Sequence, residues 1–129
     1  MARGRSSPTS SILTGDPYLA VNLHRNSSIP EALGAGRFSV RNNCIVYNPV
    51  GTANFLTPIL PAGSQLAKTA AGTVTALRIR GALAQLGRAY RVSGGEVAGA
   101  AISNKQLQAP VPARCPGRLF MFGRVMGPS

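Results

Sequence analysis

The residues best suited to chemistry lie between positions 61 and 72, where small side chains surround one cation and several hydrogen-bonding groups. Glycine and alanine let backbone N–H groups come close to phosphate oxygens. Lys68 adds a positive charge, and Ser64, Gln65 and Thr69 can bond sugar or phosphate oxygens. The stretch therefore predicts a contact with nucleic-acid backbone, and it fits an ordinary surface loop between two strands equally well.

Strands on both sides must position this stretch. Residues 49–52 (Pro-Val-Gly-Thr) predict a tight turn that leads into an apolar strand over 53–60. Residues 73–80 alternate between apolar and polar side chains, the pattern of a half-buried strand. Because Arg78 and Arg80 are two residues apart, we expect both side chains to leave the strand on the same side, spaced like successive phosphates.

Other elements follow from local pattern. The Ser-Gly-Gly sequence at residues 93–95 predicts the turn of a hairpin. Residues 28–31 predict the beginning of a short helix, and residues 82–86 predict one helical turn. The proline-rich residues 103–116 predict an irregular segment. Phe120 and Phe122 share a strand face, and core packing explains them better than base stacking. Further strands are predicted at residues 18–23, 38–47, 88–92, 96–102 and 118–122. Short strands with glycine turns favour a mainly β fold, a small antiparallel barrel.

The order of these blocks resembles ribosomal protein two of the large subunit, a universal family. Its second domain reads roughly P-V-G-T, a strand, then G-x-Q-L-A-R-x-A-G-T. Here P-V-G-T stands at residues 49–52 and G-S-Q-L-A-K-T-A-A-G-T at 63–73, with Lys68 in place of arginine. Residues 90–97 resemble the family's L-P-S-G-E-V hairpin, and residues 122–125 its closing I-G-x-V strand. The resemblance covers about residues 43 to 127.

This resemblance implies a structural constituent of the large ribosomal subunit that binds and stabilises rRNA. It implies an SH3-like barrel over residues 43–129, preceded by a basic N-terminal tail over 1–42. Full-length members carry an earlier oligonucleotide-binding-fold domain and a later extension, and neither is evident here. We therefore expect a split or reduced ribosomal protein of a mitochondrial ribosome. Its partners would be rRNA, neighbouring ribosomal proteins and a separate chain that carries the missing part.

The predicted RNA-binding residues combine the central loop, the following strand, the later arginines and the N-terminal arginines. They are Gly63, Ser64, Gln65, Lys68, Thr69, Gly72, Thr73, Arg78, Arg80, Arg88, Arg91, Arg114, Arg118, Arg124, Arg3 and Arg5.

The charge balance favours the same class of partner. Fourteen Lys and Arg residues face three Asp and Glu residues, which gives a net charge of +11. Arginine, which supplies most of these cations, suits phosphate recognition. No apolar run is long enough to predict a membrane span. No catalytic constellation, cofactor motif or metal-ligand cluster is evident, so we expect a protein that is not an enzyme.

Two regions leave alternatives open. Cys44 and Cys115 could pair with each other, but free thiols of a reducing compartment are expected, because no secretory signal is visible. Residues 1–15, rich in arginine and hydroxyl groups, fit a basic tail threaded into RNA or an organelle-targeting segment. The whole chain also allows another class of protein, a small viral coat protein with a basic genome-binding arm.

Overall fold

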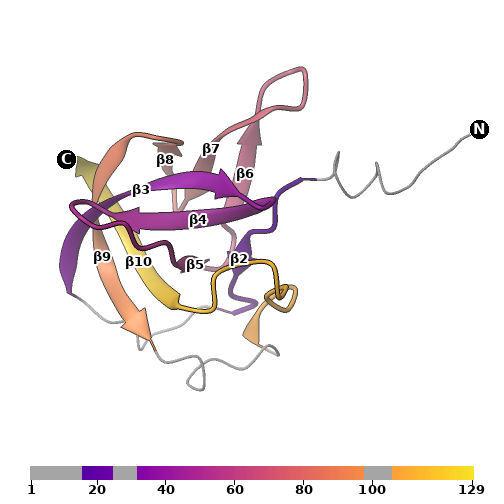
Figure 1. Cartoon of the computed structure of the whole chain (residues 1–129). Coiled ribbons are helices and arrows are strands. Elements are labelled where there is room, and N and C mark those ends of the chain that lie inside the picture. The colour runs from indigo at the N-terminus through magenta and orange to yellow at the C-terminus, as the bar shows by residue number, and fades with distance from the viewer. Residues whose placement is uncertain (1–15, 25–31, 98–105) are drawn as a thin grey trace, which may run out of the picture.

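A computed structural model describes residues 16–24, 32–97 and 106–129 of the chain (Figure 1). Within these ranges the protein is mainly β and contains no helix longer than a single turn, which confirms the predicted fold class at that level. The strands are β2 (Ala20–Val21), β3 (Leu33–Arg41), β4 (Cys44–Pro49), β5 (Thr57–Leu60), β6 (Gln65–Lys68), β7 (Val74–Ile79), β8 (Ala82–Gln85), β9 (Ala89–Val97) and β10 (Leu119–Pro128).

The strands form two sheets. The larger has the order β2-β5-β10-β9-β3-β4 and curls into a half-barrel, and the smaller has the order β6-β7-β8. β5 runs parallel to both β2 and β10, whereas the remaining pairs are antiparallel. The prediction of a purely antiparallel barrel is therefore wrong for these three strands. Parallel neighbours are joined through long connections, and local sequence pattern does not reveal which distant strands pair.

The curl brings the two ends of the larger sheet together. Tyr18, just before β2, forms an isolated bridge with Cys44 at the start of β4, and Tyr47 forms another with Leu56 just before β5. The backbone nitrogen of Ile45 donates to the carbonyl of Tyr18 at 2.8 Å. β2 and β3 both precede residue 43, so the sheet extends across the predicted boundary between tail and barrel.

Aromatic rings fill the interior. The rings of Phe38, Tyr47, Phe120 and Phe122 form one connected group with centroid distances of 4.7 to 5.7 Å. Phe122 is completely buried and Phe120 is partly buried against the same cluster, which confirms the interpretation of these two phenylalanines as core. Burial raises the pKa of Tyr47 to about 12, so its phenol stays protonated. The smaller sheet packs against the same core through Leu77, Ile79 and Ala84.

An irregular segment at residues 106–118 covers the outer side of β4 and β5. Leu107 packs with Ile59 and Met121 in one apolar cluster, while Cys115 packs with Cys44 and Val46 in another. The two cysteines form a disulfide, with their Cα atoms 5.8 Å apart. The expectation of free thiols is therefore wrong, because the fold brings together two cysteines that lie 71 residues apart in sequence.

Several local predictions are also corrected. The strand expected over 38–47 is a hairpin, because Asn42 and Asn43 adopt φ values of 50° and 56° and turn the chain. Residues 82–85 form strand β8 rather than a helical turn. The predicted turn at 93–95 is absent, since β9 runs straight through it; at Gly94 a side chain would collide with the backbone of Met121 in β10. The helix predicted from residue 28 lies outside the described residues.

Candidate nucleic-acid interface

The predicted phosphate-binding loop is replaced by ordered elements. The turn at 49–52 is confirmed, with the nitrogen of Thr52 donating to the carbonyl of Pro49 at 3.2 Å. Residues 61–64 form a second turn, in which buried Ser64 donates its hydroxyl to the carbonyl of Pro61 at 2.7 Å. β6 follows, and residues 69–72 turn the chain into β7. Ser64 is therefore committed to its own turn and is not available to a ligand.

The next predicted contact residues, Lys68, Thr69 and Gly72, belong to the hairpin between β6 and β7, which extends away from the rest of the molecule in Figure 1. Thr69 accepts a hydrogen bond from the nitrogen of Thr73 at 3.2 Å through its hydroxyl, and Gly72 adopts a φ of 88°. Lys68 is paired with Asp16, whose Oδ2 lies 2.8 Å from Nζ. The hairpin tip is exposed, but its cation already has an intramolecular partner.

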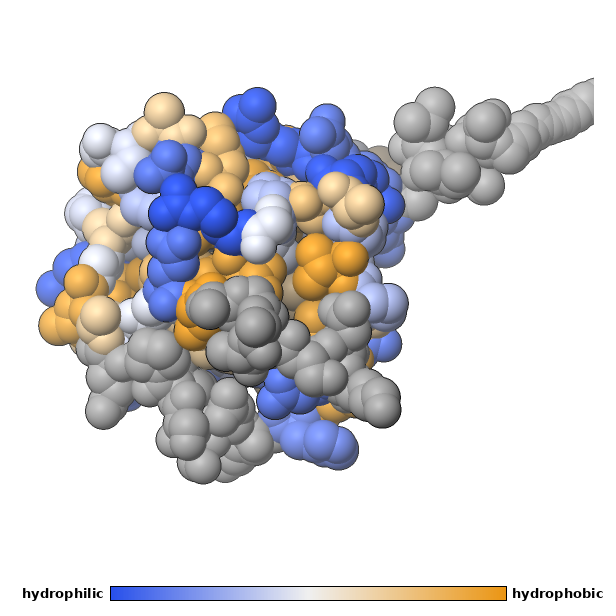
Figure 2. Space-filling model, turned by 60° about the horizontal axis from the view of Figure 1, so that its bottom comes forward, coloured by the Kyte–Doolittle hydropathy of each residue, from blue (hydrophilic) through white to orange (hydrophobic). Residues whose placement is uncertain are grey.

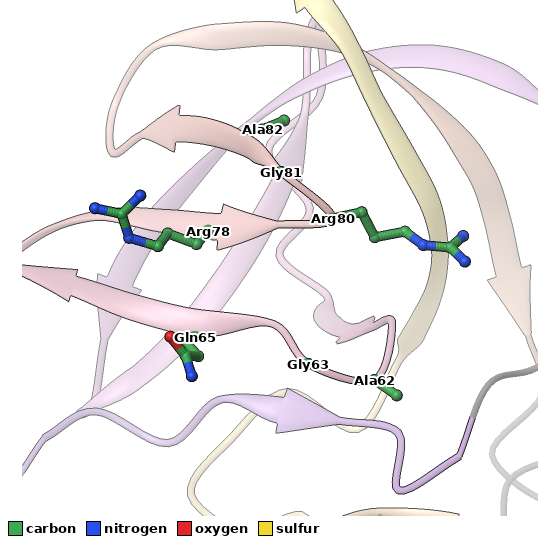
Figure 3. A pocket seen from close by; sticks show the side chains of 7 residues that line it. All are labelled: Ala62, Gly63, Gln65, Arg78, Arg80, Gly81 and Ala82. Carbon is green, nitrogen blue, oxygen red and sulfur yellow. The ribbon is translucent and has the colours of Figure 1, made fainter.

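Arg78 and Arg80 do not share a side. Arg80 follows the end of β7 with a φ of 51°, a left-handed conformation that redirects its side chain. In Figure 3 the two guanidinium groups point in opposite directions. Both residues line a hollow with Gln65 and Gly63, and Gln65 lies directly opposite Arg78 in the sheet. The predicted pair of evenly spaced cations is therefore wrong, although two of the predicted residues do meet across β6 and β7.

The open outer face of β3, β9 and β10 carries three exposed arginines, Arg37, Arg91 and Arg124, which we call the arginine face. In the β3–β9 register Arg37 lies opposite Ala89, two residues before Arg91. In the β9–β10 register Arg124 lies opposite Ser93, two residues after Arg91. Arg91 is therefore the diagonal neighbour of Arg37 on one side and of Arg124 on the other. Diagonal neighbours in a sheet have backbone positions about 7–8 Å apart.

Arg91 and Arg124 belong to the predicted set, whereas Arg37 was missed. The sequence feature that could have predicted Arg37 is its position next to Phe38 in a strand. Because side chains alternate between the two faces of a strand, an apolar Phe38 in the core places Arg37 on the outer face. Among the described residues, none of the three arginines forms an ion pair or a side-chain hydrogen bond. They are therefore the cations of this face that remain available to an external anion.

Three other predicted arginines, Arg88, Arg114 and Arg118, have partners within the described chain. The Arg114 guanidinium donates to the carbonyls of Asn42 and Asn43 at 3.0 and 3.3 Å. The Arg88 guanidinium lies 5.9 Å from the ring centre of Tyr90. Arg41, another residue that was missed, lies 4.1 Å from the ring centre of Phe55. Arg3 and Arg5 lie outside the described residues.

Arg118 and Glu96 form a two-pronged ion pair, with two contacts of 2.8 Å. Hydrogen bonds from Arg118 lower the pKa of the Glu96 carboxyl, and the same contacts raise the pKa of Arg118. Both side chains are about half exposed, so the pair is screened by water. Arg118 is thus a weaker candidate for phosphate binding than the arginine face.

The described ranges hold ten Lys and Arg residues and two acids, Asp16 and Glu96. Both acids are already paired, so the surface potential is set by the remaining cations. Figure 2 shows the hydrophilic side chains of one face in several separate groups with hydrophobic residues between them. The hydrophilic residues of that face therefore do not form one continuous patch.

No group of His, Cys, Asp and Glu residues suited to a metal ion occurs in the part of the chain that the structure describes. No helix in that part is long and apolar enough to cross a membrane. His24 is exposed, and both cysteines are joined in the disulfide.

Comparison with known proteins gives no family, no curated protein and no solved structure that matches this chain.

Proposed function

We propose that this protein is a non-enzymatic structural protein that binds RNA through phosphate contacts made by the arginine face. The observation that carries the proposal is the diagonal of Arg37, Arg91 and Arg124 on one open sheet surface. Guanidinium groups bind phosphate oxygens through paired hydrogen bonds, and these three lack competing acids among the described residues. Their diagonal spacing suits a backbone that runs obliquely over the sheet.

The finer form of this proposal is a constituent of a mitochondrial large ribosomal subunit, with an SH3-like barrel that stabilises rRNA. Its support is the resemblance of residues 49–52, 63–73 and 122–125 to the ribosomal family. The exposed hairpin tip around Thr69 and Gly72 would supply a second contact. Neighbouring ribosomal proteins, and a separate chain with the missing part of the family's protein, would complete the assembly.

The proposal is tested by measuring binding to single-stranded fragments of large-subunit rRNA over a range of salt concentrations. A triple variant with Arg37→Gln, Arg91→Gln and Arg124→Gln should bind weakly, and its log affinity should depend less steeply on log salt, by about 2. The matched control carries Arg41→Gln, Arg88→Gln and Arg114→Gln, which removes the same charge from residues with internal partners. Equal slopes for both variants would mean that only net charge matters.

A second candidate, a small coat protein of a virus, is favoured by one observation. The Cys44–Cys115 disulfide is unusual for a reducing compartment and common on extracellular and virion proteins. Sedimentation distinguishes the two functions. A single copy in a large RNA-rich particle that collapses on ribonuclease treatment supports the ribosomal form, whereas a nuclease-resistant particle of many copies supports the coat protein.

A further inference from the structure

A groove separates β8 from the last part of β10 and borders the arginine face, because Gly127 lines it and pairs with Arg91 in the neighbouring strand. Its lining includes Leu83, Gln85, Arg88, Tyr90, Val125 and Met126. We call it the β8–β10 groove. It lies where the smaller sheet meets the end of the larger one.

One wall of this groove is the outer edge of β8, which is unpaired at Leu83, whereas the carbonyl of Gln85 accepts a hydrogen bond from the N–H of Arg88. Leu86 donates its backbone N–H to Thr75 of the β7 side at 3.0 Å. Because the direction of backbone groups alternates along a strand, the N–H groups of Leu83 and Gln85 must point away from β7. The N–H of Gln85 indeed donates to the phenol oxygen of Tyr90 at 2.9 Å. No described strand pairs with β8 on the side of Leu83.

The opposite wall is also an incompletely paired strand. β10 pairs with β5 only through residues 119–121, whereas its pairing with β9 continues to Pro128. From Phe122 onward, β10 therefore has no described strand on its second side. Val125 and Met126 of this portion line the groove. Two strand edges thus face one hollow, and a strand inserted there would find backbone partners.

The side chains around the groove define what such a strand would carry. Leu83 and Met126 are 48% and 45% exposed, which is high for large apolar residues on a strand. The charged residue of the lining is Arg88. The hollow of Figure 3 adjoins this groove through Ala82, which lines both, and adds Arg78 and Arg80. Every charged residue that lines the two hollows is an arginine.

We propose that the β8–β10 groove binds an extended peptide of a partner protein, rich in acidic and apolar residues, which adds as a strand to β8. Strand addition to a free sheet edge is a general mode of peptide recognition, in which the main chain supplies affinity and side-chain pockets supply selectivity. Acidic residues would pair with Arg88, and apolar residues would cover Leu83 and Met126.

Other occupants fit this groove less well. A second copy of this chain would bring a net charge of +11 and only three acids, two of which already form ion pairs in the fold. RNA lacks the alternating donors and acceptors that pair with a strand edge, and its phosphates gain nothing from the apolar walls. The peptide interface therefore has a different chemistry from the proposed RNA-binding surface, which it adjoins where Gly127 pairs with Arg91.

The test uses the full chain and a fluorescein-labelled octapeptide of alternating glutamate and valine, with binding followed by fluorescence anisotropy. Leu83→Pro removes the outward N–H without breaking a hydrogen bond to β7, and proline is tolerated at such edge positions. It should weaken peptide binding about tenfold or more. Leu83→Ala, which keeps the N–H, should weaken binding less. Arg88→Glu, which leaves the backbone unchanged, should also reduce binding strongly.

Two further measurements make the test decisive. An octapeptide of alternating lysine and valine should bind poorly, and Leu83→Pro should leave the binding of an rRNA fragment unchanged. The proposal is overturned if Leu83→Pro and Arg88→Glu bind the acidic peptide as well as the unmodified protein does. It is equally overturned if the lysine peptide binds as tightly, or if an oligouridine RNA displaces the acidic peptide from the groove.

Discussion

Gly36 in β3 lies directly under the ring of Tyr47 in the neighbouring strand β4, so that a Cβ atom at position 36 would overlap the ring. Tyr47 is 1% exposed and packs against Phe38, Phe120 and Phe122, so its ring has no free direction in which to move. The absence of a side chain at residue 36 is thus a condition for the packing of the aromatic core.

Gly36→Ala should lower the free energy of unfolding by about 1–3 kcal/mol, the usual cost of overpacking. Urea denaturation followed by tyrosine fluorescence measures the effect. Gly34→Ala is the matched control, because a Cβ there meets nothing within 4 Å. Equal stability of the two variants would show that the core of this protein adapts to the added methyl group.

Reduction of the Cys44–Cys115 disulfide should destabilise the fold. The bond joins residues separated by 71 positions, and closing a loop of this length restricts the unfolded chain by about 4 kcal/mol in the chain-entropy model. We expect dithiothreitol to lower the urea midpoint of the unmodified protein. A double variant with Cys44→Ala and Cys115→Ala should start from a lower midpoint and not respond to dithiothreitol. An unchanged midpoint after complete reduction would show that the cross-link contributes little to stability.

The ion pair between Glu96 and Arg118 should make part of the stability dependent on pH. The pKa of Glu96 in the folded protein is lower than its usual value of 4.5, so the stabilisation is fully present above that value. It is lost as the pH falls through the lowered folded pKa, where the carboxylate takes up a proton. Arg118 does not titrate in this range.

Thermal unfolding of the unmodified protein and of Glu96→Gln checks this dependence. The unmodified protein should be modestly more stable at neutral pH, and the difference should vanish at an acidic pH below the lowered pKa of Glu96. A difference that is the same at both pH values would assign the effect to packing or hydrogen bonding rather than to charge.

Asp16→Asn should strengthen RNA binding if the β6–β7 hairpin contacts RNA. The substitution releases Lys68 from its 2.8 Å contact and removes a negative charge. The dependence of log affinity on log salt should become steeper by about 0.7. Stability should change by no more than about 1 kcal/mol, because the pair is exposed. The same substitution in a Lys68→Met background should have little effect on the slope; an equal effect in both backgrounds would rule out Lys68 as the added contact.

Local pattern predicted the elements that depend on neighbouring residues. The turn before Thr52, the strand over residues 74–79 and the placement of Phe120 and Phe122 in the core follow from turn chemistry and alternation. The hairpin at 93–95 was wrong because Gly94 has a different physical role. There glycine permits the close approach of β10, and a single sequence does not distinguish this role from a turn.

The candidate interface was less predictable, because it depends on contacts between distant residues. The pairing of Lys68 with Asp16 joins positions 52 residues apart, and it neutralises a cation that local pattern assigned to RNA. Arg37 meets Arg91 and Arg124 only through the registers of β3, β9 and β10. Arg80 diverges from Arg78 because of one left-handed backbone angle, which strand periodicity does not predict.

The position of β10 has a consequence for how the chain folds. β10 is the last described strand, yet it lies inside the larger sheet between β5 and β9, and its first residue, Leu119, pairs with Thr57. Apart from the two isolated bridges to β4, β2 and β5 are therefore joined to β9, β3 and β4 through hydrogen bonds that form only when the end of the described chain arrives. High contact order of this kind slows folding, so we expect assembly to follow synthesis and to take milliseconds to seconds. Before β10 docks, β5 and β9 would each expose an unpaired edge. A chaperone that shields strand edges would therefore bind the chain at this stage of folding.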